Sequence, residues 1–147
     1  MNDRTQLIQE DYKGSDFFPW KVLVICICLN RSSWMHAEVI IKNILKEYPN
    51  PIDFAVADYA DVYVMVKSLG FGSGRTNALI HTSIEYTRSV ILFKDDFEKY
   101  PISTFKGCGQ YAKDAWKLFV LEEPCCPNDR LLKKYAMRVG LYDDSEN

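Results

Sequence analysis

The sequence predicts an all-α fold, a compact bundle of short helices, and two observations carry this prediction. Apolar residues recur at helical spacing in several segments that brief turns connect. One further segment, VLVICIC, is rich in β-branched residues and suits a buried strand, but it would have no partner strand among these helices. At 147 residues the chain is expected to form one domain over residues 1–147, with flexible ends at 1–5 and 142–147.

The first expected helices lie in the N-terminal half. The apolar stretch VLVICIC is predicted to belong to a helix that begins at Pro19, because proline is favoured in the first turn. A second helix is predicted from Ser33, a possible N-cap, to Pro49, which stops it. Residues 60–70 form a third segment with helical spacing, which ends at a glycine.

The remaining expected helices lie in the C-terminal half. Residues 73–87 and 109–122 show helical spacing of their apolar positions. A final helix is predicted over residues 128–141, where Asn128 or Asp129 takes the capping position. A side-chain oxygen there can accept bonds from the first free backbone amides of the helix.

The composition excludes several classes of protein. With 48% hydrophobic and 26% charged residues, it fits an ordered globule rather than a disordered chain. The longest apolar run, Val22 to Leu29, is too short to cross a bilayer. The opening MNDRTQLIQE holds no apolar segment for export, so the protein is expected inside the cell.

The five cysteines are an odd number in a chain expected inside the cell, so no disulfide framework is predicted. Zinc sites usually take paired cysteine or histidine ligands at short spacing from two places. Here His36 and His81 lie far from every cysteine in the sequence. The cysteines are therefore interpreted as packing residues rather than as ligands or nucleophiles.

The distribution of charge is more informative than the formal net charge of −2. Residues 103–140 hold seven basic and four acidic side chains, a local net charge of +3. A modest basic face is therefore expected in this segment. Such a face suits a nucleic-acid ligand, and an ordinary solvated helix face would give the same count.

The turn FKGCGQY is the first feature that suggests a ligand. Gly107 and Gly109 lack Cβ atoms, so an anion such as a phosphodiester can approach the backbone amides at the start of the following helix. Cys108 between them is expected to turn inward as an apolar plug. A tight turn between two helices, with glycines for geometry only, is the alternative interpretation.

An acidic residue follows this turn. Tyr111 comes just after the glycines, and Asp129 stands 18 residues further on, at the head of the final expected helix. In this pattern the sequence resembles the helix-hairpin-helix DNA glycosylases of the endonuclease III superfamily, in which a Gly-apolar-Gly hairpin precedes the catalytic aspartate by about this interval. The resemblance implies their fold, an all-α bundle that contains a helix-hairpin-helix motif.

A more specific resemblance is to the glycosylase domain of the methyl-CpG-binding thymine DNA glycosylases. Several blocks are similar and occur in the same order: LIQE, PWKVLVICICLNRSS, KSLGFGSGRTNALI, YPISTFKGCGQYAKDAWKLF and PNDRLLKKY. Together they span most of the chain from Gln9 to Tyr135. The domain in that family is also of this size.

The resemblance implies that Asp129 is the catalytic aspartate, and a plain N-cap is the alternative role. A helix N-terminus favours the anion, which suits it to stabilise an oxocarbenium-like sugar and to orient or deprotonate a water. Tyr111 aligns with the position where bifunctional members carry a nucleophilic lysine. It is expected to line the base pocket, and base removal without strand cleavage is predicted. Asp114, a competing carboxylate inside a helix, is expected to be structural.

Three further residues acquire roles from the resemblance. Gln9 aligns with a glutamine that hydrogen-bonds the flipped pyrimidine. Arg31 aligns with an arginine that fills the gap left by the flipped base, and Phe71 falls where the family places an apolar wedge. A core residue beneath a glycine-rich loop is the alternative for Phe71.

The glycine turn would then bind the DNA backbone. The amides of Gly107 and Gly109 would contact a phosphate, and Lys106, Arg130 and Lys134 would add charge that makes binding depend on salt. In the thymine glycosylases a histidine and then a lysine stand where Arg and Leu follow the aspartate here. Affinity or rate is therefore expected to differ.

The resemblance also implies an optional ion. In related glycosylases the hairpin holds a monovalent cation, K⁺ or Na⁺, through backbone carbonyls, which here are those of Ser103, Phe105 and Cys108. No other cofactor is expected, because the four-cysteine iron–sulfur cluster of endonuclease III has no counterpart after Asp129.

These observations lead to one expected function and two alternatives. The expected protein is a monomeric, monofunctional DNA glycosylase of base excision repair that acts on double-stranded DNA with a G·T or G·U mismatch. It would work in the nucleus of a eukaryote, or otherwise in the cytoplasm with DNA. The first alternative is a non-catalytic helix-hairpin-helix module that binds DNA or protein. The second is a cysteine-based redox or hydrolytic enzyme, which has little support because no Cys–His pair is visible.

Overall fold

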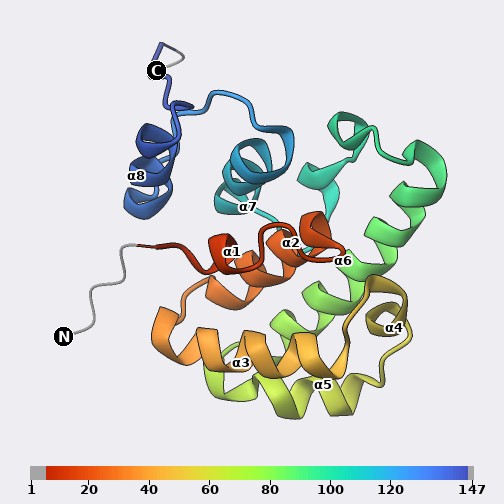
Figure 1. Cartoon of the computed structure of the whole chain (residues 1–147). Helices are drawn as coiled ribbons and strands as arrows, with labels where there is room; N and C mark the ends of the chain where they lie inside the picture. The colour runs from red at the N-terminus through yellow and green to blue at the C-terminus, as the bar shows by residue number, and fades with distance from the viewer. Residues whose placement is uncertain (1–5, 146–147) are drawn as a thin grey trace.

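The computed structural model describes residues 6–145 (Figure 1). Within these residues the chain forms helices and no strand, so the predicted all-α fold class is confirmed. The longer helices are α2 (Phe18–Leu29), α3 (Trp34–Glu47), α5 (Tyr59–Val66), α6 (Gly72–Phe93), α7 (Gln110–Trp116) and α8 (Arg130–Arg138). The shorter elements are α1 (Ile8–Asp11), α4 (Pro51–Ala55), the 3₁₀ turns η1 (Lys67–Leu69), η2 (Phe97–Lys99) and η3 (Ile102–Thr104), and the π-helical turn η4 (Lys117–Leu121). None of these helices is long and apolar enough to span a membrane.

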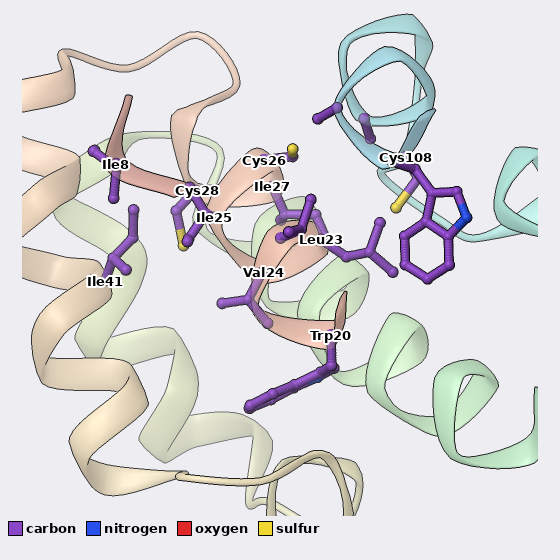
Figure 2. Packing of buried hydrophobic residues seen from close by; sticks show 14 of the residues in the cluster. Ile8, Trp20, Leu23, Val24, Ile25, Cys26, Ile27, Cys28, Ile41 and Cys108 are labelled. Carbon is purple, nitrogen blue, oxygen red and sulfur yellow. The ribbon is translucent and has the colours of Figure 1, made fainter. Parts of the chain in front are cut away.

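α2 forms the centre of the hydrophobic core. Pro19 lies in its first turn, and every side chain from Val22 to Cys28 is buried. Figure 2 shows these side chains pointing to several sides, Ile27 toward Cys108 and Val24 away from it. A helix without a solvent face carries no polar stripe, which is why its sequence can be mistaken for a strand. The helix predicted for this segment is confirmed.

The other elements surround α2. α1, α3, α6 and α7 all pack against it, and α6 also packs against α4 and α5 (Figure 1). Trp20 of α2 donates from Nε1 to Ser83 Oγ of α6 (3.0 Å), so the buried indole is satisfied in the core. The arrangement brings the C-terminal end of α2 to the glycine turn before α7, where a cavity opens.

Several element boundaries differ from the predicted ones. α6 ends at Phe93 rather than at residue 87. α4 was not expected from apolar spacing because it is about one turn long, although Asn50 caps it by accepting the Asp53 amide at 2.9 Å. The helix predicted over 109–122 divides into α7 and η4, where the widened turn precedes the end of the helix.

The C-terminal segment is partly held in place. Tyr142 pairs with Cys125 in an isolated bridge, and the Asp143 amide donates to the Cys125 carbonyl (3.1 Å). Lys133 Nζ also lies 5.4 Å from the centroid of the Tyr142 ring. The flexible end predicted at 142–147 therefore does not include Tyr142 and Asp143. Residues 1–5 and 146–147 lie outside the described residues.

The cysteines are all free, and four of the five are buried. Cys108 lies inward, as the turn sequence predicts, with 6% of its surface exposed. Within residues 6–145 no three His, Cys, Asp or Glu side chains form a group that could hold a metal ion.

Candidate functional site

A cavity of about 460 Å³ lies where α1, the end of α2, the glycine turn, α7 and the start of α8 meet. Five residues singled out from the sequence line it: Arg31, Gly107, Gly109, Tyr111 and Asp129. Apolar side chains complete the wall, among them Leu29, Trp34 and Leu131. The volume is in the range of ligand pockets, and a few polar groups converge on an otherwise apolar lining.

Asp129 stands at the start of α8 and is exposed at the cavity wall. Its Oδ2 accepts hydrogen bonds from the backbone amides of Leu131 (3.1 Å) and Leu132 (3.0 Å), so it is the N-cap that the sequence predicts. Both bonds end on one oxygen, which within the described residues leaves Oδ1 without a partner. The cap therefore fixes the carboxylate and leaves one oxygen for a ligand.

Asp114, the competing carboxylate, is buried in α7 and does not line this cavity. Its Oδ1 accepts a hydrogen bond from Gln110 Nε2 (2.8 Å) and lies 3.5 Å from the Cys125 thiol. These contacts agree with the structural role that its place inside a helix suggests.

Tyr111 lies in the first turn of α7, next to α1. Gln9 Nε2 donates to its hydroxyl (3.1 Å), although 102 residues separate the two in the sequence. Burial raises the pKa of the Tyr111 phenol, and the nearby Cys26 thiol adds to the rise. The bond from Gln9 partly offsets this rise, and the charge of Asp129 reinforces it. The phenol is therefore neutral at physiological pH.

Two buried thiols of α2, Cys26 beside the cavity and Cys28, are poor nucleophiles. Burial raises the pKa of the Cys26 thiol well above its ordinary value and that of Cys28 to about 12. A thiol that stays protonated is unreactive. Neither of these two thiols is therefore suited to act as a nucleophile.

Gln9 lies behind Tyr111 rather than in the cavity. It is fully buried and is absent from the cavity lining. Its Nε2 bonds to Tyr111 and lies 3.7 Å from Cys26 Sγ, whereas its Oε1 has no hydrogen-bond partner among the described residues. A buried acceptor without a partner is unfavourable and uncommon. In this structure Gln9 therefore does not face the cavity in which a base could contact it. Its Oε1 nevertheless remains an unpaired acceptor.

The glycine turn is bonded to α6 on its inner side. The Lys106 amide donates to His81 Nδ1 (3.2 Å), and Thr82 Oγ1 donates to the Lys106 carbonyl (3.0 Å). Cys108 Sγ lies 3.8 Å from Thr82 Oγ1. These contacts hold the turn firmly, while the Lys106 side chain stays exposed.

The two glycines of the turn have different reasons to be glycine. Gly107 has φ +82°, and an added Cβ would lie 2.5 Å from Ala78 Cβ on α6, so neither the backbone nor the packing accepts a side chain. Gly109 has φ −88°, and an added Cβ would meet nothing within 4 Å. Packing does not require a glycine there, and the open backbone at the start of α7 fits the predicted approach of an anion.

The carbonyls assigned to a monovalent cation lie in η3 and in the turn between η3 and α7. They belong to Ser103, Phe105 and Cys108. The Phe105 carbonyl already accepts the Cys108 amide (3.1 Å), which leaves it one lone pair. An all-oxygen donor set suits a hard cation, so these residues fit the ion, whose binding stays a prediction.

Arg31 and Phe71 come from different loops and lie together; they are named the loop pair below. Arg31 follows α2, Phe71 precedes α6, and the guanidinium carbon lies 5.7 Å from the ring centroid. Both have a left-handed backbone, with φ +57° and +52°. Phe71 is 65% exposed, so its alternative role as a core residue is wrong.

A second cavity of about 350 Å³ adjoins the first and shares Asn30, Arg31 and Gly107 with it. Its lining includes Arg75, a buried arginine to which no sequence pattern assigned a role. Trp34 in the first cavity was missed as well. The available signals were weak: Arg75 follows the glycine-rich FGSG, and Trp34 is an aromatic residue next to a helix cap.

The basic side chains near the site differ in availability. Lys106, Arg130 and Lys134 are exposed, and Arg130 opens α8 directly after its N-cap. Arg138 instead donates to both carboxylate oxygens of Glu10 on α1 (2.8 and 3.3 Å). The first three are therefore accessible to a ligand, and their contact with DNA phosphates stays a prediction, whereas Arg138 ties two helices together.

Comparison with known proteins connects the chain to a plant protein. No protein-family model matches the chain. The chain is 27% identical over 131 residues to a protein of Arabidopsis thaliana named methyl-CpG-binding domain protein 4-like protein. The match covers 88% of this chain and 27% of the relative, so the chain spans about a quarter of that protein's length.

Proposed function

We propose that the chain is a monofunctional DNA glycosylase that flips thymine or uracil opposite guanine and hydrolyses its N-glycosidic bond, leaving an abasic site. One observation carries the proposal: Asp129 and Tyr111 meet in a cavity that Arg31 also lines. Excision of a base from a duplex needs a pocket for the extruded base, an anion at the sugar and a group that fills the gap. The cavity provides a pocket, Asp129 provides the anion, and Arg31 is the residue that would fill the gap.

DNA as the ligand has independent support. The name of the plant relative refers to methyl-CpG, a DNA element. The exposed Lys106, Arg130 and Lys134 suit phosphates, and binding would weaken with salt. The turn between η3 and α7 would act as the hairpin of a helix-hairpin-helix motif, with the open backbone at Gly109 toward a phosphate.

Asp129 would act at the sugar. Positive charge develops on the deoxyribose as the bond from C1′ to the base breaks, and a fixed carboxylate stabilises it. The same group orients or deprotonates the water that attacks C1′. The cap bonds hold Oδ2, which preorganises the side chain and leaves Oδ1 for these tasks.

Tyr111 would determine the class of the reaction. A neutral, buried phenol offers no amine that could attack the sugar and form a Schiff base. Release of the base without strand cleavage is therefore the expected outcome.

Single-turnover excision tests the proposal. Duplexes with a central G·U, G·T or A·T pair, and a single strand with uracil, are incubated with micromolar protein, and alkali then converts abasic sites to breaks. Product from the two mismatches but not from A·T supports the proposal, and no alkali-labile product from either mismatch refutes it.

Asp129→Asn is the matched variant, because asparagine also caps a helix well. Excision is expected to fall on the order of 10²- to 10³-fold, while the thermal midpoint and DNA binding are retained. Unchanged excision in this variant would remove Asp129 from the chemistry.

A non-catalytic DNA- or protein-binding module is the second candidate. It is favoured by one observation, that the two bonds of Asp129 are those of an ordinary N-cap. Such a module would bind mismatched DNA or a protein without releasing a base, and Asp129→Asn would leave its binding unchanged.

A further inference from the structure

Arg75 of α6 is 5% exposed, and its guanidinium donates five hydrogen bonds to backbone carbonyls. Three acceptors lie at the end of α2: Ile27 (2.6 Å), Cys28 (3.3 Å) and Asn30 (2.9 Å). Two lie at the end of η1: Leu69 (3.3 Å) and Gly70 (3.1 Å). Within the described residues no carboxylate forms an ion pair with Arg75.

These acceptors explain why a cation is buried here. The last carbonyls of a helix have no partner within the helix, and a positive charge at that end is favoured by the helix dipole. Arg75 satisfies the ends of α2 and η1 at the same time. Its planar, branched donors thereby fix the position of one loop relative to the other.

Each residue of the loop pair directly follows a residue whose carbonyl accepts a bond from Arg75. Arg31 directly follows the acceptor Asn30, and Phe71 directly follows the acceptor Gly70. A left-handed backbone is unfavourable for residues with a Cβ and persists only where the surroundings impose it. Both side chains are exposed, so their own packing does not impose it. The bonds from Arg75 hold the residue before each of them, together with the turn bond from Ser32 Oγ to the Cys28 carbonyl (2.6 Å) and the bond from the Arg75 amide to the Phe71 carbonyl (2.8 Å).

We propose that Arg75 is a positioning residue for base excision, which holds Arg31 and Phe71 as one preorganised unit that enters the duplex as the base leaves. The inference rests on the proposed function. Arg75 is buried with its donors on backbone carbonyls, so the proposed role is one of position and not of contact with the reacting atoms. Without its bonds, the loop pair must be ordered at the moment of insertion, which costs conformational entropy. This cost should slow excision from a base pair, where the base must be flipped, much more than excision of a base that is already unpaired.

Amide hydrogen exchange of the free protein tests the structural part. Arg75→Lys keeps the charge, but an ammonium lacks the fork of donors that reaches both loops. Amides in residues 30–32 and 68–72 are expected to exchange on the order of tenfold faster, whereas those in 22–27 are unchanged. The matched control is Arg88→Lys on the same helix, an exposed arginine that pairs with Glu85 (2.7 Å). Unchanged exchange in both loops overturns the inference.

Excision tests the functional part. Uracil is offered in a G·U pair and in an unpaired bubble of the same duplex. Arg75→Lys is expected to slow excision from the pair about tenfold and from the bubble less than about twofold. Phe71→Ala should slow excision from the two substrates in the same proportions. The double variant should be little slower than either single variant, because both changes act on one unit. Equal losses on the two substrates, or fully additive losses, overturn the inference.

The possible failures are distinguishable. Wild-type protein that excises neither substrate refutes the proposed function, and the exchange experiment still tests the role of Arg75 in the loops. Active wild-type protein with a variant that loses both substrates equally refutes the inference alone. If Arg75→Lys does not fold, Arg75→Gln replaces it. If neither folds, Arg75 is a residue of the core and the inference is overturned.

Discussion

Two groups of residues at the candidate site are connected across the fold by different kinds of bond. Gln9, Tyr111 and Asp129, named the polar trio, come from three segments far apart in the sequence. Bonds between side chains connect these segments: Gln9 to Tyr111 (3.1 Å) and Arg138 to Glu10 (2.8 Å). Each connection therefore depends on two side chains and can be lost by substitution, and the one between Arg138 and Glu10 can also be lost when the carboxylate is protonated.

The segments that precede the loop pair are held together by one guanidinium and five backbone carbonyls. Carbonyls are present whatever the side chains, and arginine does not lose its proton in proteins. The comparison indicates that the polar trio is the adjustable part of the site and the loop pair the fixed part. Substitutions and changes of pH are therefore expected to alter the bonds of the polar trio more readily than the bonds that hold the loop pair.

The largest stability effect is expected at Gly107, which lines both cavities and so borders both groups. Gly107→Ala should destabilise the fold by about 2–4 kcal/mol, because it combines a left-handed backbone with a clash against Ala78. Urea unfolding measures the loss. Gly109→Ala, two residues away with open space, should change stability by less than about 0.5 kcal/mol.

The same two variants distinguish an effect on stability from an effect on DNA binding. If the backbone at Gly109 meets a phosphate, Gly109→Ala should weaken DNA binding at unchanged stability. Equal destabilisation by both variants would contradict the different surroundings of the two glycines.

A smaller effect is expected within the polar trio. Gln9→Met removes the bond to Tyr111 but also the unpaired Oε1, so stability should change by less than about 1 kcal/mol. If Oε1 becomes paired with the base, excision from G·U should fall about tenfold. Tyr111→Phe is the matched control, because it removes the same bond and keeps Oε1. Equal excision by the two variants would limit Gln9 to holding Tyr111.

Local signals in the sequence predicted one part of this site and not the other. The cap at Asp129 and the inward Cys108 depend on residues within about one turn, and both were predicted correctly. The contact between Gln9 and a flipped base stays a prediction, whereas its position behind Tyr111 could not be predicted, because it depends on a contact across 102 residues. Arg75 was missed because its acceptors on α2 lie 45 to 48 residues away. No local pattern encodes such a partner.

The smallest expected effect is the pH dependence of the ion pair between Glu10 and Arg138. Burial tends to raise the pKa of the Glu10 carboxyl, but the hydrogen bonds from Arg138 and the Leu7 amide outweigh it, so the pKa lies below its ordinary value of 4.5. A carboxyl that is more acidic in the folded state stabilises the fold fully above about pH 4.5 and loses this contribution as pH falls through the folded pKa.

Glu10→Gln should therefore cost about 0.5 kcal/mol at pH 7, a small value because Arg138 is 49% exposed, and less as the pH falls toward 3. Urea unfolding of both proteins at the two pH values measures this convergence. A loss that is undiminished at pH 3 would assign the effect to packing rather than to charge. Arg75→Lys supplies the contrast: its cost should be the same at both pH values, because neither a guanidinium nor a backbone carbonyl titrates in this range.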